Sequence, residues 1–246
     1  MTSSMNLIRE RAVSQDAPRH GDQGEAVQSG QFHPAAITIA ISRETGARGG
    51  SIGKRVSKKL GWSYYDQELL NYLCQGERLE DEIITGLTPE AREWVGEHLA
   101  QLKHENRLSK DAHEQDLAQL ILAIAAKGKA VIVGRGAGAL LPANCVLHVR
   151  ILAPLEDRAA WIRQIHRLTK DQAYEFITRQ DKQRAGMLDA HFKKSARDTD
   201  VYDLLLNSSR LGEQGCASVI LEAARQKQNH GQFSGSAWWN LQESQG

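Results

Sequence analysis

The stretch from Ala35 to Asp66 constrains the fold more than any other, because it joins an apolar run, a glycine-rich segment and an amphipathic segment. The apolar, β-branched run from Ile37 to Ile41 predicts a buried strand. A glycine-rich loop from Ser42 to Gly50 follows. Apolar residues then recur at every fourth position: Ile52, Val56 and Leu60. This spacing predicts one apolar stripe on a helix that Gly61 can end.

The loop between this strand and this helix has the composition of an anion-binding loop. Its glycines allow several backbone N–H groups to point at one anion, and the helix adds the positive end of its dipole. A phosphate group is the favoured ligand. The alternative is an ordinary glycine turn, which this stretch alone leaves equally open. The backbone that we expect to hold the phosphate belongs to six residues: Gly46, Ala47, Gly49, Gly50, Ser51 and Ile52.

Length and composition are those of a globular α/β domain. The 246 residues, 41% of them hydrophobic, can build one full core. The formal net charge of +1 gives no general attraction to nucleic acid or to an acidic membrane. The longest apolar stretch, Leu120 to Ala126, is too short to cross a bilayer. Three scattered cysteines favour a reducing compartment, so we expect a cytoplasmic protein. We expect its partners to be small molecules.

Strand and helix signals alternate along the rest of the chain. Further strands are predicted at 62–66, 130–133, 145–152 and 201–206. Helices are predicted between 67 and 127, after Pro154, at a Thr169–Gln172 capping box, and over 212–224. This alternation predicts a five-stranded parallel sheet covered on both faces. Ligands then bind at the carboxyl ends of the strands, where the loop and Asp66 are expected, although Asp66 could simply cap the next helix.

Several segments resemble one family of kinases. Ile41 to Gly53 resembles the opening of the cytidylate kinase-like family, which runs roughly I-S-R-E-Y-G-S-G-G-x-x-I-G. Gly134 to Pro142 resembles the G-R-D-x-G-T-V-V-F-P segment of cytidylate kinases, short by one residue. Asp181 to Arg184 resembles their D-x-x-R segment, and Tyr202 to Asn207 their last strand. The resemblance covers roughly residues 36 to 225.

The resemblance implies the three-layer α/β/α fold of the P-loop nucleoside monophosphate kinases. It places a helical, acceptor-binding excursion at 67–127 and a lid at about 158–197, within a domain that spans 35–226. Polar composition predicts a disordered N-terminal tail over 1–34 and a polar C-terminal tail over 227–246.

The phosphate loop departs from the usual pattern at its catalytic position. The usual loop places a lysine on the terminal phosphates and a hydroxyl on magnesium. Against the G-P-S-G-A-G-K-G-T loop of bacterial cytidylate kinases, Gly49 stands at the lysine position and Ser51 keeps the hydroxyl. Arg43 and Arg48 replace glycines. Either arginine could supply the missing charge, or each could be a solvated surface residue.

Other roles follow from the resemblance. Arg135 and Arg184 are the candidates for the acceptor phosphate, and Asp181 would contact a ribose or hold Arg184. Arg163 falls on the helix that leads to the lid. Asp66 would orient an acceptor hydroxyl or a metal-bound water.

These residues predict a nucleotide kinase. It would transfer a phosphoryl group from ATP, with Mg²⁺ as cofactor, to a nucleoside monophosphate of the CMP or dCMP kind. The alternative is a catalytically weak or inactive nucleotide-binding module of the same fold. The missing lysine favours that alternative, and so does Gly136, which stands where cytidylate kinases have a substrate-binding aspartate.

Overall fold

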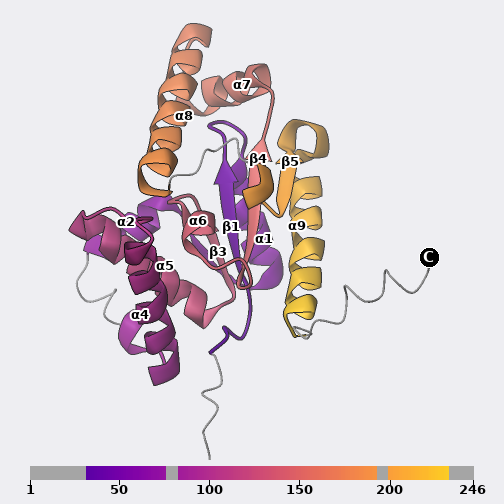
Figure 1. The fold of residues 1–246 in the computed structure, drawn as a ribbon. Helices are drawn as coiled ribbons and strands as arrows, with labels where there is room; N and C mark the ends of the chain where they lie inside the picture. The colour runs from indigo at the N-terminus through magenta and orange to yellow at the C-terminus, as the bar shows by residue number, and fades with distance from the viewer. Residues whose placement is uncertain (1–31, 76–82, 193–198, 233–246) are drawn as a thin grey trace, which may run out of the picture. The chain divides into compact units, whose positions relative to one another are not determined.

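The computed structural model describes residues 32–75, 83–192 and 199–232, all within the unit that begins at Phe32. Its strands are β1 (Thr38–Arg43), β2 (Ser63–Tyr65), β3 (Ala130–Val133), β4 (Val146–Leu152) and β5 (Leu204–Asn207). In the described part of the chain these strands form one parallel sheet in the order β2-β3-β1-β4-β5 (Figure 1). The predicted five-stranded parallel sheet is therefore confirmed.

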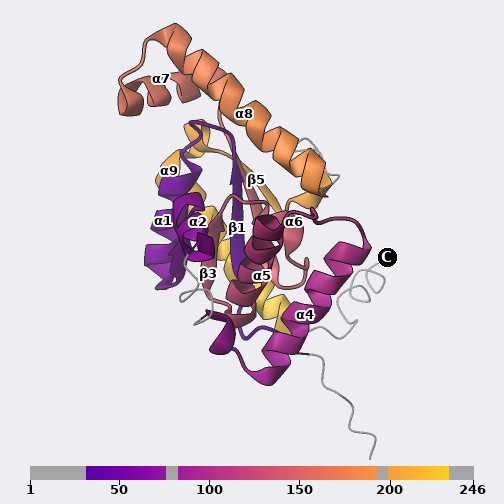
Figure 2. The same ribbon diagram turned by 90° about the vertical axis from the view of Figure 1, so that its left-hand side faces the viewer.

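Helices cover both faces of this sheet, as Figure 2 shows. On one face lie α1 (Gly49–Leu60) and α9 (Ser208–Gln232), against the buried side chains of Ile39 and Ile41. On the other face lie α5 (Ala112–Lys127) and the short α6 (Ala137–Leu140), with α2 (Gln67–Gln75) and α4 (Pro89–His104) packed beyond α5. Successive residues of β1 point to opposite faces of the sheet, so this strand contributes side chains to both faces.

Two further helices lie beyond the carboxyl ends of the strands (Figures 1 and 2). They are α7 (Leu155–His166) and α8 (Lys170–Phe192), and they pack on each other through a small apolar cluster of their own: Ala159, Ile162, Ala173 and Ile177. This pair occupies most of the region expected to form a lid. Residues 193–198 of that region lie outside the described residues.

Several local signals are confirmed. Gly61 ends α1 with φ of 65°, and the Thr88 side chain accepts a hydrogen bond from Ala91 N–H at the start of α4. Thr169 and Gln172 form the predicted capping box, with reciprocal bonds of 2.9 and 3.3 Å.

Some boundaries differ from the prediction. The last strand begins at Leu204 because Thr199–Val201 forms a 3₁₀ turn, and α9 continues to Gln232. Of the expected tails, 1–34 and 227–246, residues 1–31 and 233–246 lie outside the described ranges, whereas 227–232 belong to α9. The domain limits stay predictions. Among the described helices, none has the length and apolar character needed to span a membrane.

Candidate functional site

The glycine-rich loop turns sharply between β1 and α1, at the carboxyl edge of the central strand. Gly46 has φ of 83°, and Arg48, the residue before α1, has φ of 61°. A left-handed backbone costs a non-glycine residue about 1 kcal/mol, so the turn at Arg48 is held by its surroundings. The Arg48 carbonyl accepts the N–H of Ile52 at 3.0 Å and so begins the helix.

Five backbone N–H groups of this loop have no acceptor among the described residues. They belong to Gly46, Arg48, Gly49, Gly50 and Ser51. The amides of Ala47 and Ile52, which were also expected to face phosphate, instead donate to the carbonyls of Glu44 and Arg48 and close the turn. Unpaired donors at a helix N-terminus are the groups that bind phosphate.

Arg43, the last residue of β1, passes its side chain between two glycines. A Cβ on Gly49 would lie 2.7 Å from the Cβ of Arg43 and 3.0 Å from its Cγ. A Cβ on Gly134, which follows β3, would collide with the guanidinium and lie 3.0 Å from its Cζ. Gly134 follows β3, which neighbours β1, and Gly49 begins α1, so the Arg43 side chain lies between these two glycines.

Three guanidinium groups converge at this edge. The Arg184 Nη1, from α8, donates to the Thr45 hydroxyl at 2.8 Å, and Arg135 donates from the loop after β3 to the Asn71 side chain of α2. Burial, and then the charges of Arg184 and Arg135, lower the pKa of Arg43 to about 10. Burial also lowers the pKa of Arg135 and that of Arg184. The structure thus brings together Arg43, Arg135 and Arg184.

Asp181 joins α8 to the loop. Its carboxylate accepts the Thr45 N–H at 2.8 Å and pairs with Arg158 Nη1 of α7 at 2.6 Å. The buried Arg158 also donates to the Thr45 carbonyl at 3.2 Å and lies 3.6 Å from Glu44 Oε2. Sequence spacing could not pair these residues, because they come from the loop and from two different helices. This network holds α7 and α8 against Thr45.

Comparison with known proteins decides the family. The description of the cytidylate kinase-like family matches residues 38–210, well over half of the chain. The chain belongs to the cytidylate kinase-like family. A comparison with curated proteins found no match.

A solved structure supports the fold of this cytidylate kinase-like chain. An uncharacterized protein from Eubacterium ventriosum is 18% identical, with a TM-score of 0.54 over 77% of this chain and 98% of that one. The shikimate kinase from Bacteroides thetaiotaomicron aligns over the same shares at 14% identity, with a TM-score of 0.43. The first of these likenesses bears on the fold alone.

Three other predicted site residues of this family member lie outside the arginine cluster or serve the fold. The Arg48 guanidinium lies 5.0 Å from the ring centroid of Trp161, on α7. Arg163 is exposed on α7, and its side chain makes no hydrogen bond or ion pair within the described ranges. Asp66 accepts the Leu69 N–H at 3.0 Å, so it does cap α2, while its charge still raises the pKa of Arg43.

ATP and magnesium fit these residues. Five unpaired amides and three guanidinium groups offer donors and positive charge to a polyphosphate. The Ser51 side chain, in the first turn of α1, makes no hydrogen bond to any described residue. Within the described ranges, no three His, Cys, Asp or Glu side chains gather to hold a metal. The Ser51 hydroxyl is of the oxygen type that Mg²⁺ prefers, and it would hold a magnesium ion together with phosphate oxygens and water.

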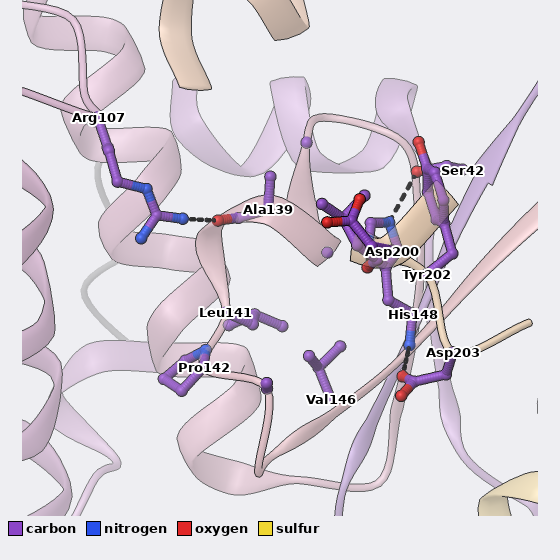
Figure 3. Close-up of a pocket in the computed structure, with 14 residues that line it drawn as sticks. Ser42, Arg107, Ala139, Leu141, Pro142, Val146, His148, Asp200, Tyr202 and Asp203 are labelled. Atoms are coloured by element: carbon purple, nitrogen blue, oxygen red, sulfur yellow. Dashed lines mark hydrogen bonds between the residues drawn. The ribbon is translucent and has the colours of Figure 1, made fainter. Parts of the chain in front are cut away.

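A separate cavity of about 400 Å³ lies beside α6, on the sheet face opposite α1 (Figure 3). Leu141 and Val146 form an apolar wall, and Ser42 and His148 form part of a polar one. The Nδ1–H of His148 donates to the Val201 carbonyl at 2.9 Å, so its Nε2 accepts from the Ser42 hydroxyl at 3.0 Å. The cavity does not include the loop amides. An open rim of N–H donors can hold a phosphate without an enclosed cavity.

Proposed function

We propose that the chain is a phosphotransferase that moves a phosphoryl group from Mg-ATP to a nucleoside monophosphate of the CMP or dCMP kind. One observation carries this proposal: Arg43, Arg135 and Arg184 converge beside the unpaired loop amides. Burial, and then the charges of Arg184 and Arg135, lower the pKa of Arg43, so a bound anion would stabilise the charged form of this arginine. Membership of the cytidylate kinase-like family supports a phosphorylated ligand as that anion.

The residues divide between the two substrates. The amides of Gly46, Arg48, Gly49, Gly50 and Ser51 hold the phosphates of ATP, and bound magnesium would neutralise the charge that develops on them. Phosphoryl transfer asks the protein chiefly for position and positive charge, which these groups supply.

Arg135 and Arg184 hold the phosphate of the acceptor. They reach the loop from opposite sides, one beside α2 and the other from α8. In this proposal Asp181 fixes α8 through Thr45 and Arg158, which keeps Arg184 in place. Asp66 keeps one carboxylate oxygen for an acceptor group while the other caps α2.

The Arg48 side chain and Arg163 have a lesser part in this proposal. Arg48 stacks on Trp161 and so links the loop to α7, and Arg163 lies on the exposed side of that helix. A cytoplasmic location, expected from the scattered cysteines, stays a prediction.

The second candidate is a nucleotide-binding module that transfers phosphate slowly or not at all. Two observations favour it: Gly49 stands at the lysine position, and Gly136 stands where cytidylate kinases have an aspartate. This module would keep the anion site and lack turnover.

A coupled assay separates the two candidates. Mg-ATP is offered with CMP, dCMP, UMP, AMP, GMP and non-nucleotide acceptors, and ATP binding is measured calorimetrically in parallel. The kinase predicts turnover that is largest with CMP or dCMP and that falls about 100-fold or more in Arg135→Ala. Arg225→Ala, which removes an exposed arginine of α9, is the matched control and should leave turnover unchanged. Tight ATP binding without turnover for any acceptor would establish the second candidate.

A further inference from the structure

The loop that lacks a lysine at position 49 contains an arginine six residues earlier, and the two positions are in contact. The usual loop has glycine at the position of Arg43 and lysine at the position of Gly49. Here the strand end carries the long cation and the first residue of α1 carries no side chain. Both departures occur within one loop, and the structure shows why they occur together.

Arg43 and a side chain at position 49 exclude each other. A Cβ on Gly49 would meet the Cβ of Arg43 at 2.7 Å and its Cγ at 3.0 Å, whereas real Cβ contacts essentially never fall below 3.0 Å. The nearer obstructing atom is the Cβ of Arg43, which cannot move without the strand. The arginine stem therefore fills the space from which a lysine would leave α1.

The far end of the Arg43 side chain also has a prepared position. Its guanidinium lies against Gly134, where any Cβ would collide with it. Gly134 has φ of 92°, so the backbone there favours glycine for a second reason. Within the described residues, the Arg43 guanidinium makes no hydrogen bond or ion pair. Its donors remain available to a ligand while the stem stays fixed between two glycines.

We propose that Arg43 is the catalytic cation of this phosphate loop, delivering from the end of β1 the charge that a lysine would deliver from α1. This proposal rests on the proposed function. In the step that it assists, an oxygen of the acceptor phosphate forms a bond to the γ-phosphorus of ATP. The bond from that phosphorus to the β,γ-bridging oxygen breaks, and its electron pair stays on ADP. A dianionic acceptor phosphate has no proton to lose, so charge stabilisation is the main demand on Arg43.

A reciprocal exchange tests this assignment. Arg43→Ala should lower kcat by about 10³-fold or more, the scale of a lost transition-state cation. Gly49→Lys should be similarly impaired, because the new side chain meets the Arg43 stem. The double variant Arg43→Gly with Gly49→Lys restores the usual loop and should recover turnover to within about 10-fold of the parent protein. Full turnover in Arg43→Ala would overturn the proposal, and so would a folded double variant no more active than Arg43→Gly alone.

Binding of inorganic tripolyphosphate, measured by calorimetry, gives a readout that does not depend on turnover. Arg43→Ala should weaken this binding at least 10-fold, because it removes the guanidinium that lies against Gly134 with its donors unpaired among the described residues. Arg55→Ala, an exposed arginine of α1, is the matched control and should leave binding and turnover unchanged. Equal binding by the parent protein and Arg43→Ala would overturn the proposal even if the double variant failed to fold.

The two proposals can fail separately. If the parent protein binds tripolyphosphate through Arg43 but transfers phosphate to no acceptor, the kinase proposal fails and the cation site stands. If turnover is present and indifferent to Arg43, the kinase proposal stands and the assignment of Arg43 fails.

Discussion

Replacing Arg43 with methionine should make the ligand-free protein more stable. Methionine keeps an unbranched stem between Gly49 and Gly134 but removes the charge that faces Arg135 and Arg184. An arginine whose pKa is lowered in the folded state is a cost to folding. That cost is fully present below the folded pKa and is relieved only as the pH rises toward the unfolded value.

The size of the effect follows from this pKa. It falls from 12.5 to about 10, and each pKa unit corresponds to about 1.4 kcal/mol, so the charge costs the folded state about 3 kcal/mol. Asp66 attracts Arg43, and that attraction is already contained in the figure. Imperfect packing of the thioether would remove part of the gain. We therefore expect Arg43→Met to raise the free energy of unfolding by about 1–2 kcal/mol at pH 7.

Urea unfolding at pH 7, with and without tripolyphosphate, measures this prediction. The parent protein should gain about 2.7 kcal/mol at a ligand concentration of 100 Kd, and Arg43→Met should gain much less at the same concentration. Arg55→Met, at an exposed position of α1, should change stability by less than about 0.5 kcal/mol. A less stable ligand-free Arg43→Met, together with an unchanged gain from tripolyphosphate, would refute the reasoning.

Three further predictions concern contacts around the site. Asp181→Asn breaks the 2.6 Å pair with buried Arg158, so urea unfolding should show a free energy of unfolding lower by about 2–3 kcal/mol. The loss should be smaller when Arg158 is changed to Met in the same protein. Gly138→Ala places a Cβ inside the His148 ring, and thermal unfolding should show a loss of about 1–3 kcal/mol. Burial lowers the pKa of His148 from 6.5 to about 4. The stability that comes from keeping this imidazole neutral is therefore complete above pH 6.5 and is lost as the pH falls toward 4. Urea unfolding of His148→Gln should show a weaker dependence on pH across that range.

Much of the fold could be predicted from the sequence because its signals are local. The apolar run that begins at Ile37 is buried in the central strand, and Gly61 and Gly128 end helices with positive φ. The length of α8 was not predictable in this way. The apolar contacts with α7, through Ala173 and Ile177, lie in its first half, and the segment from Asp181 to Arg184 carries charges without an apolar stripe.

The site was predictable only in part. The loop, Arg135 and Arg184 were found because each lies in a short segment that resembles the family. The network of Thr45, Asp181 and Arg158 was not found, because it joins residues up to 136 positions apart. The choice between Arg43 and Arg48 also required coordinates, since both stand at positions where the loop of bacterial cytidylate kinases has glycine.

The anchoring of α8 bears on how the loop can serve a ligand. Asp181 accepts the N–H of Thr45, Arg158 donates to the Thr45 carbonyl, and Arg184 donates to the Thr45 hydroxyl. The polar groups of the loop that face α7 and α8 are therefore already paired. The unpaired amides follow from Gly46 into the first turn of α1, beside the Arg43 stem. A polyphosphate could therefore bind to those amides without displacing Asp181. It would also supply the negative charge that the arginine cluster lacks. Binding of the ligand would therefore relieve the repulsion of Arg43 by Arg184 and Arg135.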